Sequence, residues 1–262
     1  MKFLQLTNVP AAIESYLAEG STKAIEIGQS TANVYQIIQD TQHFYLKVSS
    51  ISPYFSFQNE VDILHWLAGK LPVPRVQEYE IDSQNEYLIL SNVAGHNCVE
   101  AMALLDPHLI IEQLALGLRQ IHALDISDCP FNQRIADKLK HGYQRVINGL
   151  VDEDDFDPNH MGKTGQQIYT ALVDLQPEED DLVFSHGDYC LPNIIINSGQ
   201  ISGYIDFDRA GISDRYNDLA IASRSIASNF GQEYEQLFFD CYGLKTVDQE
   251  KIQYYRTMDE LF

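Results

Sequence analysis

The 262-residue sequence has few basic residues, few cysteines and no long apolar run. No apolar stretch reaches the roughly 18 residues that a membrane-spanning helix needs, and the N-terminal stretch lacks the apolar centre of a signal peptide. The four cysteines are far apart and include no C-x-x-C pair, so we expect reduced thiols rather than a disulfide framework. We therefore expect a cytoplasmic protein with no membrane partner.

The charge balance is unusual, because only 17 basic residues oppose 38 acidic ones and the net charge is −21. This imbalance argues against nucleic acid as a partner, since nucleic acids are bound through lysine and arginine. Two interpretations of the acidity stay open. The charge either keeps the protein soluble, for example in a salty cytoplasm, or attracts a cationic ligand into an acidic cleft.

The order of the predicted elements indicates an α+β fold with two lobes. Residues 1–95, with a hinge near Ser91–Gly95, are expected to form a small β-rich lobe, and residues 96–262 a larger helical lobe. In the first lobe we predict strands at Lys23–Ile27, Val34–Gln39, Phe44–Val48, Val76–Ile81 and Tyr87–Leu90, and helices at Ala11–Glu19 and Phe57–Gly69. In the second we predict helices at Leu109–Leu124, Arg134–Ile147, Gly165–Leu175, Asp214–Ser228, Glu233–Tyr242 and Asp248–Glu260. The only strand-like interruption that we expect there is a hairpin of Ile194–Ile196 and Ile201–Ile205.

The chemistry is concentrated in the segment His186-Gly187-Asp188 and in two later residues, Asn193 and Asp206. The predicted hairpin brings Asp206 back beside Asn193. With this spacing Asp188 can accept the proton of a substrate hydroxyl, while Asn193 and Asp206 offer oxygen atoms to Mg²⁺. The pattern therefore predicts phosphoryl transfer. The alternative is that Asp188 and Asp206 are ordinary acids in turns.

Two features of the first lobe suit nucleotide phosphates. Lys47 lies on a strand between apolar neighbours, and Glu60 begins the next predicted helix, where it can pair with the lysine. The loop Gly28–Val34 is rich in small and hydroxyl residues, which suits a loop lying over phosphates. Alone, each feature is also typical of a solvent-facing pair or of an ordinary hairpin loop.

The second lobe carries an acidic run from Asp152 to Asp157, and the chain ends with Asp259-Glu260-Leu261-Phe262. The run is either a solvated loop or an electrostatic clamp for a ligand rich in ammonium groups. The apolar Leu261 and Phe262 could dock the acidic tail so that it lines a cleft.

The sequence resembles the aminoglycoside phosphotransferase family, whose fold is protein-kinase-like. The likeness covers nearly the whole chain and rests on Ile27–Ser30, Tyr45–Lys47, Trp66–Pro74, Leu124–Pro130, Leu182–Asn193, Gly203–Gly211, Asp214–Tyr216 and the closing Asp259–Phe262. The segment Leu124–Pro130 and the closing residues point to the group that phosphorylates the 3'-hydroxyl.

The resemblance implies a role for each matching residue. Asp188 would be the catalytic base, and Asn193 and Asp206 would hold Mg²⁺. The ATP site would be formed by Ser30, Tyr45, Lys47, Glu60, Ser91 and Val93, with Tyr45 stacked on adenine. Asp155, Asp157, Arg209, Glu260 and the Phe262 carboxylate would shape the antibiotic pocket.

The expected function is ATP-dependent phosphorylation of kanamycin- or neomycin-type aminoglycosides, which confers resistance, by a monomer or weak dimer. The chain departs from the family where Phe207 and Asp208 replace the usual Leu-Gly, and where Ser228 and Asn229 replace an acidic pair. These changes leave open a kinase of another small amino alcohol or sugar-like compound. A protein that binds nucleotide or drug without catalysis is a further alternative. Asp188 argues against it, because a binding protein needs no acid that activates a hydroxyl.

Overall fold

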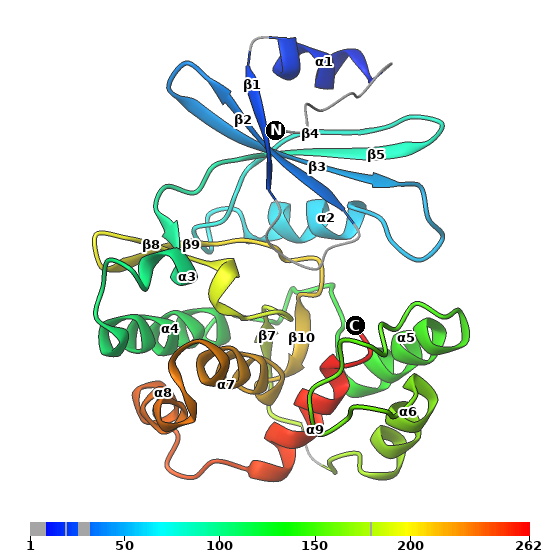
Figure 1. Ribbon diagram of the computed structural model, residues 1–262, viewed down its shortest axis with the longest axis vertical. Coiled ribbons are helices and arrows are strands. Elements are labelled where there is room, and N and C mark those ends of the chain that lie inside the picture. The colour runs from blue at the N-terminus through cyan, green and yellow to red at the C-terminus, as the bar shows by residue number, and fades with distance from the viewer. Residues whose placement is uncertain (1–8, 19, 26–31, 179) are drawn as a thin grey trace. The chain divides into compact units, whose positions relative to one another are not determined.

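The computed structural model describes residues 9–18, 20–25, 32–178 and 180–262 (Figure 1). The chain divides into two compact units. The first takes the residues up to Gly95 together with Ile195–Asn197 and Ser202–Asp208, and the second takes His96–Ile194, Ser198–Ile201 and Arg209–Phe262. A β-rich N-terminal part and a mostly helical C-terminal part confirm the predicted α+β class. The described residues contain no helix with the length and apolarity needed to cross a membrane.

The first unit is built on a five-stranded antiparallel sheet in the order β1-β2-β3-β5-β4. Its strands are β1 (Ser21–Ile25), β2 (Asn33–Gln39), β3 (Gln42–Ser50), β4 (Val76–Ile81) and β5 (Asn85–Ser91), and its helices are α1 (Ala11–Ala18) and α2 (Gln58–Leu67). All of these elements were predicted, with ends shifted by a few residues. The predictions for residues 19, 26 and 27 lie outside the described part of the chain.

Side chains alternate between the two faces of a strand, so neighbouring residues of β3 make different contacts. On one face, Leu46 and Val48 of β3 form an apolar cluster with Ile13 of α1. Lys47 lies between them in sequence and points to the other face, where it meets Glu60 of α2. The alternation within β3 thus both anchors α1 and aims the lysine at α2.

The second unit is mostly helical (Figure 1). Its α-helices are α3 (Cys98–Ala101), α4 (Pro107–His122), α5 (Ile135–Ile147), α6 (Gly165–Asp174), α7 (Tyr216–Phe230), α8 (Glu235–Tyr242) and α9 (Gln249–Asp259), with 3₁₀ turns η1 (Leu191–Asn193) and η2 (Gln232–Tyr234). The remaining strands are β6 (His96–Asn97), β7 (Leu182–Ser185), β8 (Ile194–Asn197), β9 (Gln200–Tyr204) and β10 (Gly211–Asp214).

The expectation of a single strand-like hairpin after Gly95 was wrong. The hairpin exists as β8 and β9, but β7 also pairs antiparallel with β10, so that Ser185 faces Gly211 and Leu182 faces Asp214. Each of these strands has only four residues, and the sequence between them is long, so no local pattern reveals the pairing. Asp214, predicted to open a helix, instead ends β10, and α7 begins at Tyr216.

Candidate active site

The catalytic loop, residues 186–193, joins β7 to β8 and brings Asp188 and Asn193 together. Nδ2 of Asn193 donates hydrogen bonds to the carboxylate Oδ2 of Asp188 at 2.8 Å and to its main-chain oxygen at 3.0 Å. The amide nitrogen makes both bonds, so the amide oxygen is the atom of Asn193 left for a cation. A side chain that can take a proton and a neutral oxygen ligand therefore lie next to each other.

The start of this loop requires a glycine. Gly187 has a φ of 86°, which other residues rarely adopt, and a Cβ atom there would lie 1.9 Å from the main-chain oxygen of Arg209. Any side chain would push the loop away from the segment that leaves β9. The glycine of the His-Gly-Asp motif thus serves close packing.

A buried carboxylate, Asp218 of α7, anchors the loop through hydrogen bonds. It accepts hydrogen bonds from the Ser185 hydroxyl at 2.9 Å and from the main-chain N–H groups of His186 and Gly187 at 2.8 and 2.9 Å. Its fourth partner is Nε2 of His122 on α4, at 3.0 Å. Nδ2 of Asn217 adds a longer contact at 3.4 Å. Asp218 is fully buried, so these donors replace the water that it has lost.

The same contacts set the ionisation of Asp218. Burial alone would raise the pKa of this carboxyl group, but the hydrogen bond and charge of His122, the charge of His186 and the Gly187 N–H outweigh it. The pKa falls to about 2, so Asp218 is ionised throughout the physiological pH range. His186, predicted to hold the loop beside Asp188, does so through its main chain and through a 3.4 Å bond from the Asp188 N–H to its Nδ1.

In the first unit, one lysine serves two carboxylates. Nζ of Lys47 lies 2.8 Å from both carboxylate oxygens of Glu60 and 2.9 Å from Oδ1 of Asp206. The predicted pairing of Lys47 with Glu60 is therefore present. Burial would lower the pKa of Lys47, but the two carboxylates raise it above its ordinary value, so the ammonium is charged.

Glu60 is the member of this cluster that ionises least readily. Burial raises its pKa, Lys47 opposes the shift, and the charges of Asp206 and Asp208 add to it, which leaves the pKa at about 7. Asp206 has a φ of 67°, a left-handed conformation that is strained for a residue other than glycine. Such strain is found where a side chain must be aimed at a functional position.

The other residues predicted to bind nucleotide are more scattered. Ser30 lies outside the described residues. Tyr45 accepts a hydrogen bond on its hydroxyl from Gln36 at 3.3 Å, and the Ser91 N–H donates to the main-chain oxygen of Arg75. Ser91 and Val93 line a cavity of about 560 Å³ together with Gln42–Phe44, Pro72, Val73, Arg75, Gln77, Asn92, Ala94 and Ser202. Their contact with adenine stays a prediction.

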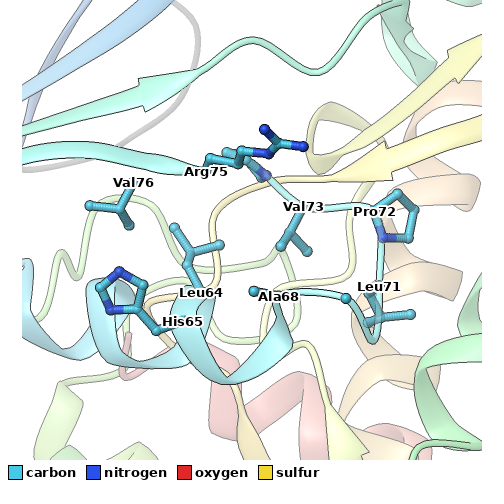
Figure 2. Close-up of a pocket in the computed structure, with 10 residues that line it drawn as sticks. Leu64, His65, Ala68, Leu71, Pro72, Val73, Arg75 and Val76 are labelled. Carbon is cyan, nitrogen blue, oxygen red and sulfur yellow. The ribbon is translucent and has the colours of Figure 1, made fainter.

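A second cavity of about 360 Å³ lies at the end of α2 (Figure 2). It is lined by Leu64, His65, Ala68 and Gly69 and by the segment from Leu71 to Val76. Figure 2 shows the apolar side chains of Leu64, Val73 and Val76 around it, with the Arg75 guanidinium directed away. This lining contains no carboxylate or amide, so it does not resemble a phosphoryl-transfer site.

The predicted antibiotic residues belong to three segments of the second unit: the acidic run, the link from β9 to β10 that carries Arg209, and the chain end. Asp155 is exposed, whereas Asp157 lies with its Oδ2 3.6 Å from Arg224. The Glu260 carboxylate is 97 % buried; it accepts a hydrogen bond from Nδ1 of His160 at 2.8 Å and from the Asp157 N–H at 3.2 Å. The structure therefore joins the acidic run to the chain end.

The last residue is surrounded by cations. The guanidinium carbon of Arg209 lies 5.3 Å from the centre of the Phe262 ring, with Nζ of Lys138 at 5.5 Å. Arg209 also forms an ion pair with Asp259, which a second arginine, Arg224 of α7, shares. This arrangement holds the tail that the sequence predicted to dock.

Several of these contacts were missed from the sequence alone. Asp218, His122, His160 and Arg224 carry no recognisable motif. One signal was available, because Asp218 precedes the apolar run Leu219–Ala222 and an acid in such a run must be buried with partners. The partners themselves come from distant elements and could not be named.

A model of the phosphotransferase enzyme family matches residues 21–261 of the sequence. The chain belongs to this family. An aminoglycoside 3'-phosphotransferase of Niallia circulans is 34% identical over 262 residues, which cover 97% of this chain and 98% of that protein. One of Enterococcus faecalis is 37% identical, and 95% of each chain is covered.

Solved structures of phosphotransferases show the same fold. The crystal structure of aminoglycoside-3'-phosphotransferase of type VIII matches with a TM-score of 0.83 and 28% identity, over 97% of this chain and 100% of that chain. The Streptomyces rimosus enzyme APH(3'')-Id, in complex with ADP and streptomycin, matches with a TM-score of 0.80 and 23% identity, over 95% and 97% of the two chains. The predicted protein-kinase-like fold is confirmed.

Proposed function

We propose that this protein transfers the γ-phosphoryl group of ATP to the 3'-hydroxyl of an aminoglycoside antibiotic and thereby inactivates it. The observation that carries the proposal is the Asp188 carboxylate, hydrogen-bonded to Asn193 on a loop that Asp218 fixes. In a phosphotransferase whose relatives are named aminoglycoside 3'-phosphotransferases, such an acid accepts the proton of the attacking hydroxyl as its oxygen bonds to the γ-phosphorus and the bond from that phosphorus to ADP breaks.

The nucleotide and the metal are assigned to the residues of the two charged clusters. Lys47 binds the phosphates of ATP and Glu60 holds it in place, while Ser30, Tyr45, Ser91 and Val93 contact the rest of the nucleotide. Asn193 and Asp206 would hold Mg²⁺, which would supply positive charge against the transferred phosphoryl group. An amide oxygen and a carboxylate suit this hard cation, which takes few protein ligands because it binds phosphates and water as well.

The described residues contain no group of three or more histidine, cysteine, aspartate or glutamate side chains that could form a metal cage. We also propose that the reaction takes place in the cytoplasm, where ATP is supplied. The expectations of a monomer or weak dimer and of no nucleic-acid partner stay predictions.

The antibiotic is assigned to the acidic run from Asp152 to Asp157 and to the chain end. Asp155, Asp157, Glu260 and the Phe262 carboxylate supply negative charge for the ammonium groups of the drug, and Arg209 positions the tail through Asp259. The net charge of −21 then has a cause besides solubility. Ser228 and Asn229, which replace an acidic pair of the relatives, are exposed. This replacement reduces the number of drugs that bind and leaves the phosphoryl-transfer step unchanged.

The test uses purified protein, Mg-ATP and kanamycin, with a 3'-deoxy aminoglycoside as the matched control. We expect kanamycin to gain about 80 Da, the mass of one phosphoryl group, and the 3'-deoxy analogue to gain nothing. Phosphorylation of both compounds would overturn the 3' assignment. A drug that binds without any mass gain would indicate a sequestering protein. The changed residues Ser228 and Asn229 favour one rival, an amino-alcohol or sugar kinase, which would release ADP with small alcohols but with no aminoglycoside.

A further inference from the structure

The acidic segment, defined as residues 150–160, is tied to the chain end at both of its ends. At its beginning, Arg145 of α5 donates from Nη2 to the main-chain oxygens of Leu150 at 2.9 Å and Phe262 at 3.1 Å. Its Nε donates to the Leu261 oxygen at 2.6 Å. Arg145 therefore fixes one end of the segment independently of what happens at the other.

At the other end the tie is made by the His160 side chain and by the main chain of Asp157. Nδ1 of His160 lies 2.8 Å from Oε1 of Glu260, and the two side chains are 8% and 3% exposed. An ionised carboxylate can only accept a hydrogen bond, so Nδ1 is the donor. The main-chain N–H of His160 donates to the main-chain oxygen of Asp157 at 2.7 Å, and the main-chain N–H of Asp157 donates to the Glu260 carboxylate. His160, Asp157 and Glu260 thus close a ring of hydrogen bonds.

This ring holds together two carboxylates that repel each other. The charge of Asp157 and burial both act against ionisation of Glu260. Arg224 offsets part of the repulsion, but it lies 3.6 Å from Asp157 and is shared with Asp259. The His160 ring, with Thr257 Oγ1 3.5 Å from its Nε2, is the side-chain donor that keeps the Glu260 carboxylate facing the acidic segment.

We propose that His160 is a positioning residue for the aminoglycoside: by holding Glu260 against the main chain of Asp157 it fixes the partly exposed Asp157 carboxylate in one position for the drug, with the buried Glu260 charge behind it. The inference rests on the proposed function. Preformed charge strengthens binding because the ligand does not have to order the groups that it meets. Loss of His160 frees only the distal end of the acidic segment, since Arg145 retains the other.

The test compares His160→Ala, His160→Asn and His160→Gln with His141→Ala, an exposed histidine of α5. The amide nitrogen of asparagine lies where Nδ1 of histidine does, whereas that of glutamine reaches toward Nε2. We expect the alanine and glutamine variants to raise KM for kanamycin about tenfold, while kcat and KM for ATP change less than about twofold. The asparagine variant should stay within about threefold of the wild type, and His141→Ala should match it.

If the wild-type enzyme phosphorylates kanamycin, the proposed function stands, and two results would still overturn this inference. One is an unchanged KM for kanamycin in His160→Ala. The other is a kcat of His160→Ala that falls by the same factor as KM for kanamycin rises. Should the alanine variant fail to fold, the comparison of asparagine with glutamine decides, and equal KM values for these two contradict the Nδ1 assignment. A wild-type protein that phosphorylates no aminoglycoside overturns the proposed function and this inference with it.

Discussion

The catalytic loop and the acidic segment of the second unit are anchored in the same way, and their anchors behave in opposite ways. Each is held by a buried carboxylate of a later helical segment that is paired with a histidine, Asp218 with His122 and Glu260 with His160. Asp218 has several donors besides its histidine, and its pKa falls to about 2. Glu260 lies beside another carboxylate, and burial and that neighbour raise its pKa.

The difference follows from what each segment has to do. The catalytic loop keeps one geometry through every step, so a saturated, permanently ionised anchor suits it. In the proposed function the acidic segment accepts the ammonium groups of the drug, and a carboxylate whose charge is only partly compensated is stabilised when they bind. We infer that donor saturation, rather than burial itself, decides whether a buried charge here stabilises the fold.

The largest effect is expected for Asp218→Asn. The asparagine amide has one acceptor oxygen and cannot accept from all the donors around Asp218. His122 and His186, whose charges lower the pKa of Asp218, also lose the negative charge that they face. We expect the free energy of unfolding in urea to fall by about 3–5 kcal/mol and kcat to fall about a hundredfold. Asp240→Asn, an exposed aspartate of α8, is the control and should change neither. A stable Asp218→Asn enzyme with normal turnover would remove the distinction between the two anchors.

A buried cation extends the comparison. Lys138 of α5 is 2% exposed, and its Nζ lies 5.5 Å from the centre of the Phe262 ring. Burial and the charge of Arg209 lower its pKa to about 8, against the pull of Asp259, Asp218 and Asp188. The charged form therefore costs stability below pH 8, and the cost disappears as the pH rises toward the ordinary value of 10.5.

Lys138→Met should therefore raise the free energy of unfolding by about 1–3 kcal/mol at pH 7, with the gain shrinking above pH 8. Denaturant titrations at pH 7, 8.5 and 10 measure this, with Lys140→Met, an exposed residue of the same helix, as the control. If Lys138→Met is less stable than the wild type at pH 7, the attraction of the neighbouring carboxylates for the ammonium outweighs the cost of burying it.

The smallest effect on stability is expected for Glu260→Gln. A carboxyl group whose pKa is raised by folding favours the protonated form, so its contribution is present below its ordinary pKa and is lost as the pH rises through the shifted value. At pH 7 glutamine should thus change the free energy of unfolding by less than about 1 kcal/mol, while its oxygen still accepts from Asp157. KM for kanamycin should nevertheless rise about tenfold. A destabilisation as large as that of Asp218→Asn would show that the two anchors are equivalent.

The sequence singled out the residues to which we assign the chemistry, but not the residues that hold them in place. Asp188 and Asn193 were recognised because their spacing is fixed by one short loop, and Lys47 with Glu60 because a strand and a helix follow each other. Asp218, His160 and the pairing of β7 with β10 escaped, since each depends on partners brought together by the whole fold. The role of Ser30 stays a prediction, as do the contacts of the drug.

The measurement that tests the account most directly is the kcat of Asp188→Ala for kanamycin at saturating Mg-ATP, with Asp174→Ala, an exposed aspartate of α6, as the control. We predict a fall of about three orders of magnitude or more with ATP binding largely intact, because the loop retains its Asp218 anchor and loses only the proton acceptor. Turnover close to that of the wild type would contradict the assignment of Asp188.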